Sequence, residues 1–255
     1  GFAAQKDPKI RTVEGVLNRA LSEVTGETIL VAGASRTDAG VHALCNYAVF
    51  DTSSPIPAEK FAPAVNTRLP DDIRVRKSMQ VEPDFHPRML QTEKTYEYRI
   101  YRAGIPDPLH ARYFAWTYFP LNVSAMRRAA AYLVGEHDFA SFRNPAGTAA
   151  TTVRTITAIE IEEKSCRVPD LMRTGDPSLD LRDEAGEIIL RVRGTGFLYN
   201  MVRIIAGTLI RVGRGMMDPD SMPEILDKRD RRAAGDTAPA CGLCLVNYRI
   251  LGKKS

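Results

Sequence analysis

Residues 34–44 carry the side chains best suited to chemistry, because an acidic and a basic residue lie two positions apart among small residues. The stretch reads Ala-Ser-Arg-Thr-Asp-Ala-Gly-Val-His-Ala-Leu, with Arg36 and Asp38 as the charged pair. Apolar runs at 28–32 and 46–50 flank it, which predicts a loop held between two strands. Loops on rigid strands often carry reactive groups. Asp38 is therefore the first candidate catalytic residue, although a lone loop Asp more often serves as a turn or cap residue.

The basic residues of the chain are mostly arginine. The net charge is +4, with 26 Arg and 9 Lys. The planar guanidinium grips phosphate and stacks on bases, so this bias fits a nucleic-acid partner, while a GC-rich genome would produce the same bias. No apolar run has the length of a membrane span and no secretory leader is visible, so we expect a cytoplasmic protein that does not bind membranes.

Two of the four cysteines have the spacing of metal ligands. Cys241 and Cys244 form a Cys-x-x-Cys motif, but a structural zinc site needs two further ligands. Cys45 and Cys166 are solitary in the sequence. We therefore expect no metal site, and free thiols are typical of a reducing cytoplasm.

Hydrophobic periodicity predicts an α+β protein with helices on one face of its sheet. We expect helices at 12–25, 57–67, 122–134, 197–213 and 219–228, and strands at 27–33, 45–51, 73–80, 93–101, 151–162, 187–194 and 243–250. Turn residues at 104–108 mark a boundary between an N-terminal half, 1–104, and a C-terminal half, 105–255. Residues 164–186 are polar and rich in Pro, Gly and Asp, which predicts a surface insertion.

Nine short motifs follow one another across nearly the whole chain. In order they are Gly1-Phe2-Ala-Ala-Gln5, Thr12-Val-Glu-Gly15, Arg36-Thr-Asp-Ala-Gly-Val-His-Ala43, Asn66-Thr-Arg-Leu-Pro-Asp-Asp-Ile73, Phe85-His-Pro-Arg88 with Lys94-Thr-Tyr-Glu-Tyr98, Gly135-Glu-His-Asp-Phe-x-x-Phe142, Thr152-Val-Arg-x-Ile156, Phe197-Leu-Tyr-Asn-Met-Val-Arg-x-Ile-x-Gly207, and Ala238-Pro-Ala-x-Gly-Leu243. They resemble the motifs of the TruA family of tRNA pseudouridine synthases. Phe2 stands where the family usually has Trp, and the strand before this segment is absent, so we expect the chain to lack about one strand.

The resemblance implies a fold and an activity. The fold would be two ferredoxin-like, or RRM-like, split βαβ halves with a joined, mainly antiparallel sheet and a central cleft. The activity would be the isomerisation of uridine to pseudouridine in the anticodon arm of tRNA, at tRNA positions 38 to 40, by a homodimer that uses no cofactor and no metal. Asp38 would be the catalytic residue.

The same resemblance assigns residues that bind the substrate. Tyr96 would lie beside the target base, although a strand Tyr in isolation is more often a core residue. Arg203 would face the catalytic Asp and Leu198 would line the pocket. Alternatively, Arg203 belongs to one solvated helix face with Tyr199, Asn200, Gly207, Arg211 and Arg214. Arg36 and Arg88 are candidates for contacting phosphate or holding a displaced base.

A single carboxylate fits an isomerisation in which the leaving base is retained, since ordinary glycosidases need two. Asp38 would either attack carbon 1′ of the ribose or remove a proton from carbon 2′. Three alternatives stay open: a pseudouridine synthase acting on other tRNA or RNA sites, an RNA-binding module without catalysis, and a hydrolytic nucleosidase that pairs Asp38 with a carboxylate such as Asp138.

Overall fold

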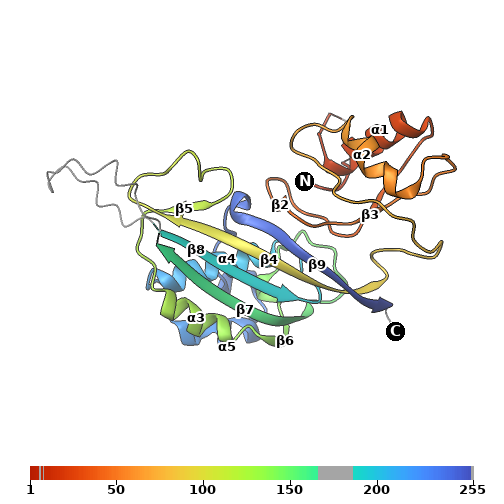
Figure 1. Ribbon diagram of the computed structural model, residues 1–255. Helices are drawn as coiled ribbons and strands as arrows, with labels where there is room; N and C mark the ends of the chain where they lie inside the picture. The colour runs from red at the N-terminus through yellow and green to blue at the C-terminus, as the bar shows by residue number, and fades with distance from the viewer. Residues whose placement is uncertain (6, 8, 166–185, 254–255) are drawn as a thin grey trace, which may run out of the picture. The chain divides into compact units, whose positions relative to one another are not determined.

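The computed structural model describes residues 1–5, 7, 9–165 and 186–253 (Figure 1). The chain forms two compact units. The first unit contains residues 1–39, 45–91 and the C-terminal end from 251, and the second contains 40–44 and 92–250. Residues 104–108, where the sequence suggests a boundary, lie inside the second unit. The division into halves at 104 remains a prediction.

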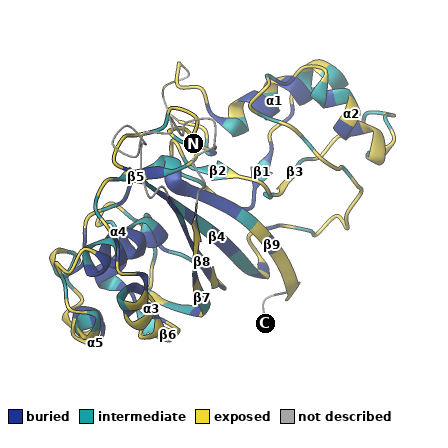
Figure 2. Ribbon diagram, turned by 60° about the vertical axis from the view of Figure 1, so that its left-hand side comes forward, coloured by how far each residue is buried: buried dark blue, intermediate teal, exposed yellow. Residues whose placement is uncertain are grey.

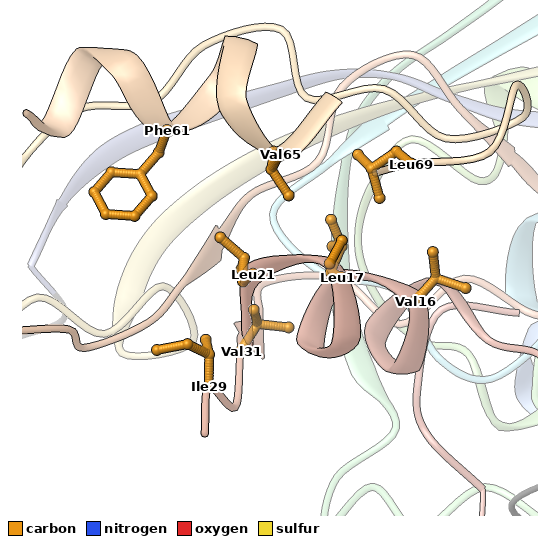
Figure 3. Packing of buried hydrophobic residues seen from close by; sticks show 9 residues of the cluster. Val16, Leu17, Leu21, Ile29, Val31, Phe61, Val65 and Leu69 are labelled. Carbon is orange, nitrogen blue, oxygen red and sulfur yellow. The ribbon is translucent and has the colours of Figure 1, made fainter. Parts of the chain in front are cut away.

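The core of the first unit is formed by two helices and the segments beside them. Helix α1 spans Val13–Thr25, with the Thr12 side chain accepting from the Gly15 amide and Gly26 ending the helix in the left-handed conformation. Helix α2 spans Phe61–Asn66 and follows the 3₁₀ turn Ala58–Lys60. Figure 3 shows apolar side chains of both helices packed together with those of neighbouring segments: Val16, Leu17, Leu21, Ile29, Val31, Phe61, Val65 and Leu69. Both predicted helices are confirmed.

The strands of the first unit are shorter than the sequence predicts. Strands β1, Ala32–Gly33, and β3, Ala48–Val49, pair antiparallel over two residue pairs. The strand predicted at 73–80 is wrong, because this segment joins no ladder. Side chains take the place of a neighbouring strand: Asn66 bonds both backbone groups of Val75 at 2.8 Å, and Ser78 Oγ accepts from the Ala62 amide.

The second unit is built on a mainly antiparallel sheet. Its strands run in the order β2 (His42–Ala43), β9 (Leu243–Lys253), β4 (Leu90–Arg102), β8 (Gly186–Gly194), β7 (Val153–Ser165) and β6 (Gly135–Asp138), and β5 (Ala115–Thr117) also pairs with β4. Long antiparallel ladders join β4 to β8 and β8 to β7, while β2–β9 and β4–β5 are parallel. The predicted α+β class with a mainly antiparallel sheet is confirmed.

Three helices cover one face of this sheet (Figure 1). They are α3 (Val123–Ala131), α4 (Met201–Gly213) and α5 (Met222–Lys228), the last preceded by the 3₁₀ turn Pro219–Ser221. Figure 2 shows the buried residues concentrated along α4 and the central strands. Helix α4 begins four residues later than predicted, because Asn200 before it adopts a left-handed conformation with φ of 60°. Most of the predicted insertion at 164–186 lies outside the described residues.

Candidate active site

The segment that leads into Asp38 is held by hydrogen bonds on nearly every residue. The Gly33 carbonyl accepts from Arg88 Nε at 2.9 Å, and the Ala34 amide donates to the Tyr47 carbonyl at 2.8 Å. The Ser35 carbonyl accepts from the side-chain amide of Asn46 at 3.0 Å. Ala34 and Ser35 are both buried. The backbone that carries Asp38 is therefore fixed by the first unit itself.

The N-terminal segment supports the same loop from another side. The Phe2 amide donates to the Thr37 carbonyl at 3.0 Å, directly before Asp38. The Phe2 ring is buried and fills the space beside Gly33, where an added Cβ would lie 2.0 Å from a ring carbon. Phe2 thus contacts the segment 33–38 near both ends, because its ring packs on Gly33 and its amide bonds Thr37. The sequence motif marks Phe2 only as a departure from Trp, so its support of the loop is learned from the structure.

The loop continues past Asp38 into the second unit. Gly40 has φ of 79°, and an added Cβ would lie 3.2 Å from that of Ala240, so this position favours glycine. His42 belongs to strand β2, where it pairs with Cys244, and its Nε2 lies 2.9 Å from the Arg112 carbonyl oxygen. These contacts give His42 a structural role.

Arg36 and Arg88 line one hollow in the first unit. Its volume is about 470 Å³, and Phe2, Gln5 and Glu14 also line it. Both arginines are exposed, while Glu14 Oε2 accepts from the Ala4 amide at 2.7 Å. Two guanidinium groups beside one bonded carboxylate give the hollow a positive balance, which suits an anion or a polar base. The structure brings these two predicted residues together.

Tyr96 and Tyr98 lie on β4 and are both buried. The ring of Tyr96 meets that of Phe197 edge-on, with centroids 5.2 Å apart. Tyr98 is fully buried and its hydroxyl donates to the Pro239 carbonyl at 2.9 Å, so Tyr98 is a core residue. Burial also raises the pKa of the Tyr98 hydroxyl. Phe197 was not among the predicted site residues, and its signal was its place directly before Leu198 in the shared motif.

Arg203 projects from the first turn of α4 and is half-buried. Its Nε donates to the Ala238 carbonyl at 2.8 Å and its Nη1 to Asn200 Oδ1 at 3.1 Å. One turn further on, Gly207 is buried so tightly that an added Cβ would lie 1.8 Å from the Asp236 carbonyl oxygen. The alternative of one solvated face from Tyr199 to Arg214 is therefore wrong at Gly207, because residues 236–238 pack against this side of the helix.

The predicted residues divide between the two units. Asp38, Arg36 and Arg88 belong to the first unit. Tyr96, the buried Leu198 and Arg203 belong to the second. Within the second unit, Leu198 follows Phe197, the ring partner of Tyr96, and precedes the helix that carries Arg203.

The cysteines of the Cys-x-x-Cys motif contact backbone groups. Cys241 Sγ lies 3.4 Å from the Phe114 carbonyl oxygen, and the buried Cys244 has its Sγ 3.8 Å from that of Leu245. Burial raises the pKa of the Cys244 thiol. Among the described residues, no group of three or more His, Cys, Asp or Glu side chains is arranged to hold a metal ion. None of the helices that the described residues form has the length and the apolar composition that a membrane span requires.

Comparison of the sequence with known proteins agrees with the motif resemblance. The family described as tRNA pseudouridine synthase matches residues 1–88 and 129–249. The chain is 42% identical over 242 residues to tRNA pseudouridine synthase A of Acetivibrio thermocellus, covering 95% of this chain and 91% of that protein. It is 43% identical over 245 residues to the protein of the same name from Brevibacillus brevis, covering 96% and 91%.

A third relative, tRNA pseudouridine synthase A 2 of Clostridium perfringens, is 41% identical over 244 residues, which are 96% of this chain and 92% of that protein. The chain belongs to the tRNA pseudouridine synthase family. It is an isomerase that converts uridine in tRNA to pseudouridine.

Proposed function

We propose that this enzyme modifies uridines of the tRNA anticodon arm, at tRNA positions 38 to 40, with Asp38 as its catalytic carboxylate. The observation that carries the proposal is the segment 33–38, whose backbone is bonded at Gly33, Ala34, Ser35 and Thr37 and which ends in Asp38. A reacting group needs a fixed position relative to its substrate. The segment supplies that fixed position next to the one acidic side chain of the Arg-Thr-Asp-Ala-Gly motif.

The reaction needs one ionised carboxylate. The glycosidic bond from carbon 1′ of the ribose to nitrogen 1 of uracil breaks, the base turns, and a bond forms from carbon 1′ to carbon 5. The hydrogen of carbon 5 is then lost and nitrogen 1 gains a proton. Asp38 would start this sequence either by attacking carbon 1′ or by removing a proton from carbon 2′. No electrons are exchanged with a second reactant, so the reaction calls for no redox cofactor.

The remaining site residues would bind the target nucleotide and its neighbours. Tyr96 offers a ring already oriented by Phe197, and Leu198 offers an apolar side chain shortly before α4. Arg203 offers a guanidinium whose direction is set by the Ala238 carbonyl. Arg36 and Arg88 share the hollow of the first unit, whose size and charge suit a phosphate or a displaced base. The acting form would be a homodimer in the cytoplasm.

The direct test compares tRNA from cells with and without the gene for this chain. We expect pseudouridine at positions 38 to 40 only when the gene is present. In vitro, tRNA carrying tritium at carbon 5 of uridine should release that tritium, because carbon 5 exchanges its hydrogen for the ribose. The Asp38→Asn variant should bind tRNA and lose turnover by several orders of magnitude.

Each alternative gives a different product. A nucleosidase would release free uracil, and a binding module would leave tRNA unchanged. A synthase with other targets would carry out the same reaction, but the pseudouridines would be found at other positions of the RNA. Appreciable turnover by purified Asp38→Asn enzyme would remove Asp38 from the catalytic role while leaving the family assignment in place.

A further inference from the structure

An exposed row of aromatic side chains lies in the second unit at and after strand β5. Trp116, in β5, is 44% exposed, and Tyr118, just beyond it, is 57% exposed. The segment before the strand adds Tyr113, which is 48% exposed. Large aromatic side chains so open to water and so close together in one segment commonly mark a binding surface.

Three of the rings form a continuous run of tilted ring-to-ring contacts. The centroids of Trp116 and Tyr118 are 5.9 Å apart, and those of Tyr118 and Phe119 are 3.9 Å apart, with planes tilted by about 35° in each pair. The guanidinium carbon of Arg214, at the end of α4, lies 3.6 Å from the Phe119 centroid. The order Arg214–Phe119–Tyr118–Trp116, which we call the aromatic stack, thus has a cation at one end and an exposed indole at the other.

The stack is held in place by the fold. Trp116 pairs with Tyr101 of β4 in the parallel β4–β5 ladder, and its indole Nε1 donates to the Ala103 carbonyl at 2.9 Å. The Ala103 amide in turn donates to the Thr117 carbonyl at 3.2 Å. The indole therefore keeps its orientation while almost half of its surface is open to solvent. A pre-ordered ring loses little conformational entropy when a ligand stacks on it.

We propose that the aromatic stack binds an unpaired base of the tRNA, outside the residues that act on the target uridine; this rests on the proposed function. Two features favour RNA over an apolar protein partner. The stack carries the cation Arg214, and the exposed Arg112 precedes Tyr113, so the surface offers charge for phosphate beside rings for bases. Arrangements of aromatic rings with basic side chains are how proteins bind single-stranded nucleic acid with little sequence preference.

The sole tryptophan of the chain reports on this contact, because Trp116 is the only one. Its fluorescence should be quenched when the protein is titrated with unmodified tRNA or with a single-stranded RNA of the anticodon-loop sequence. Heparin is the control, since it carries anionic groups and no bases. We expect heparin to bind without quenching. Equal quenching by heparin and RNA would overturn the proposal.

Variants separate stacking from charge. Trp116→Leu should weaken tRNA binding by roughly 5- to 150-fold, by the same factor at low and high salt, because stacking releases no counterions. Trp116→Phe should restore most of the affinity. The matched control is Tyr132→Leu, which removes a half-exposed ring directly after α3, where the Tyr132 hydroxyl donates to Asp220. That variant should leave tRNA affinity unchanged. Circular dichroism and thermal melting would confirm that each variant folds.

The outcomes distinguish this proposal from the proposed function. If wild-type protein modifies tRNA and Trp116→Leu binds it as tightly as wild type, the aromatic stack is not a tRNA surface. If Trp116→Leu instead changes the sedimentation coefficient and leaves the tRNA affinity intact, the stack is an interface between copies of the chain, which also overturns the proposal. If wild-type protein forms no pseudouridine at positions 38 to 40, it is the anticodon-arm assignment that fails.

Discussion

Tyr96 meets Phe197 edge-on, with ring centroids 5.2 Å apart and planes at 87°. Because Tyr96 is also buried, at 8% exposure, its ring is fixed by packing in the second unit before any RNA binds. A ring that is already oriented can stack on a base at little entropic cost. The contact thus gives Tyr96 a structural role, and it would also orient the ring for the proposed position beside the target base.

Two substitutions of Tyr96 separate these roles. Tyr96→Phe keeps the ring, so tRNA affinity should remain near that of wild type, while turnover falls if the hydroxyl handles a proton at carbon 5. Tyr96→Ala should lower stability by about 3 kcal/mol or more, as is usual for deleting a buried aromatic ring, and weaken tRNA binding more than Tyr96→Phe does.

The control for Tyr96→Phe is Tyr98→Phe. Tyr98 lies two residues away, and its hydroxyl donates to the Pro239 carbonyl at 2.9 Å. Removing this hydroxyl should lower the free energy of unfolding by about 1 kcal/mol and leave turnover unchanged. Single-turnover kinetics, tRNA titration and urea unfolding measure the three quantities. If Tyr96→Phe and Tyr98→Phe behave alike in all three, Tyr96 is a core residue only.

Arg203 can be compared with a second arginine that makes the same kind of hydrogen bond. Arg203 Nε donates to the Ala238 carbonyl at 2.8 Å, and Arg127 Nε of helix α3 donates to the Ile161 carbonyl at 3.0 Å. Each Arg→Met change removes a hydrogen bond from a backbone carbonyl and should destabilise by roughly 1–3 kcal/mol. Only Arg203→Met should reduce turnover below that explained by the folded fraction.

Arg203→Lys refines that test. An ammonium keeps the charge and loses the two-pronged geometry, so it should recover only part of the activity lost in Arg203→Met. Turnover and unfolding are measured on the same preparations, well below the melting temperature. Near-normal turnover in Arg203→Met would mean that Arg203 has a structural role only.

Phe2 and Gly33 should be energetically coupled, because the Phe2 ring fills the space that a Cβ at Gly33 would need. We expect Gly33→Ala alone to be strongly destabilising and Phe2→Ala alone to cost about 3–5 kcal/mol. In the Phe2→Ala background, Gly33→Ala should cost much less, since the space is then empty. A double-mutant cycle by urea unfolding measures the coupling. Additive costs would mean that the ring moves aside freely.

How far the sequence predicts this protein depends on the kind of contact. Helix α1 is predictable because its apolar spacing, the Thr12 cap and the terminal Gly26 are all local signals. The segment 73–80 is not, because its alternation is typical of a strand while its partners are the side chains of Asn66 and Ser78. Local patterns do not record which group will bond a backbone amide.

The candidate site follows the same rule. The loop with Asp38 stands out from its composition and its flanking strands. The burial of Gly207 against Asp236 and the packing of Phe2 on Gly33 depend on residues about 30 positions apart in the chain, and no local period marks them. The motif resemblance points to Arg203 and Tyr96. The hydrogen bond of Arg203 to Ala238 and the ring contact of Tyr96 with Phe197 are seen only in the folded chain.

Glu97 on β4 should make stability depend on pH. Its carboxylate accepts from Arg99 and from Arg191 Nε, both at 2.9 Å, and its side chain is only 14% exposed. Burial by itself would raise the pKa of the Glu97 carboxyl, but the hydrogen bonds from Arg191 and Arg99 together outweigh it and hold that pKa below its usual value. A carboxyl whose pKa is lowered by folding binds fewer protons in the native state than in the unfolded one.

The sign of the effect follows from that difference. The stabilisation by Glu97 is fully present above the pKa of the carboxyl in the unfolded chain and is lost as the pH falls through the lower pKa of the folded protein. Glu97→Gln should therefore lower the free energy of unfolding by about 1–2 kcal/mol at pH 7. The expected loss is kept this small because Arg191 is about one-third exposed, and solvent screens its attraction to Glu97. The difference in the free energy of unfolding between Glu97→Gln and wild type should disappear in acid.

Glu224→Gln, which breaks an exposed pair with Lys228 in α5, is the matched control and should change stability little at any pH. Urea unfolding from pH 3 to pH 8 measures both, and a difference between Glu97→Gln and wild type that is constant across this range would mean that the ion pairs of Glu97 contribute nothing to folding.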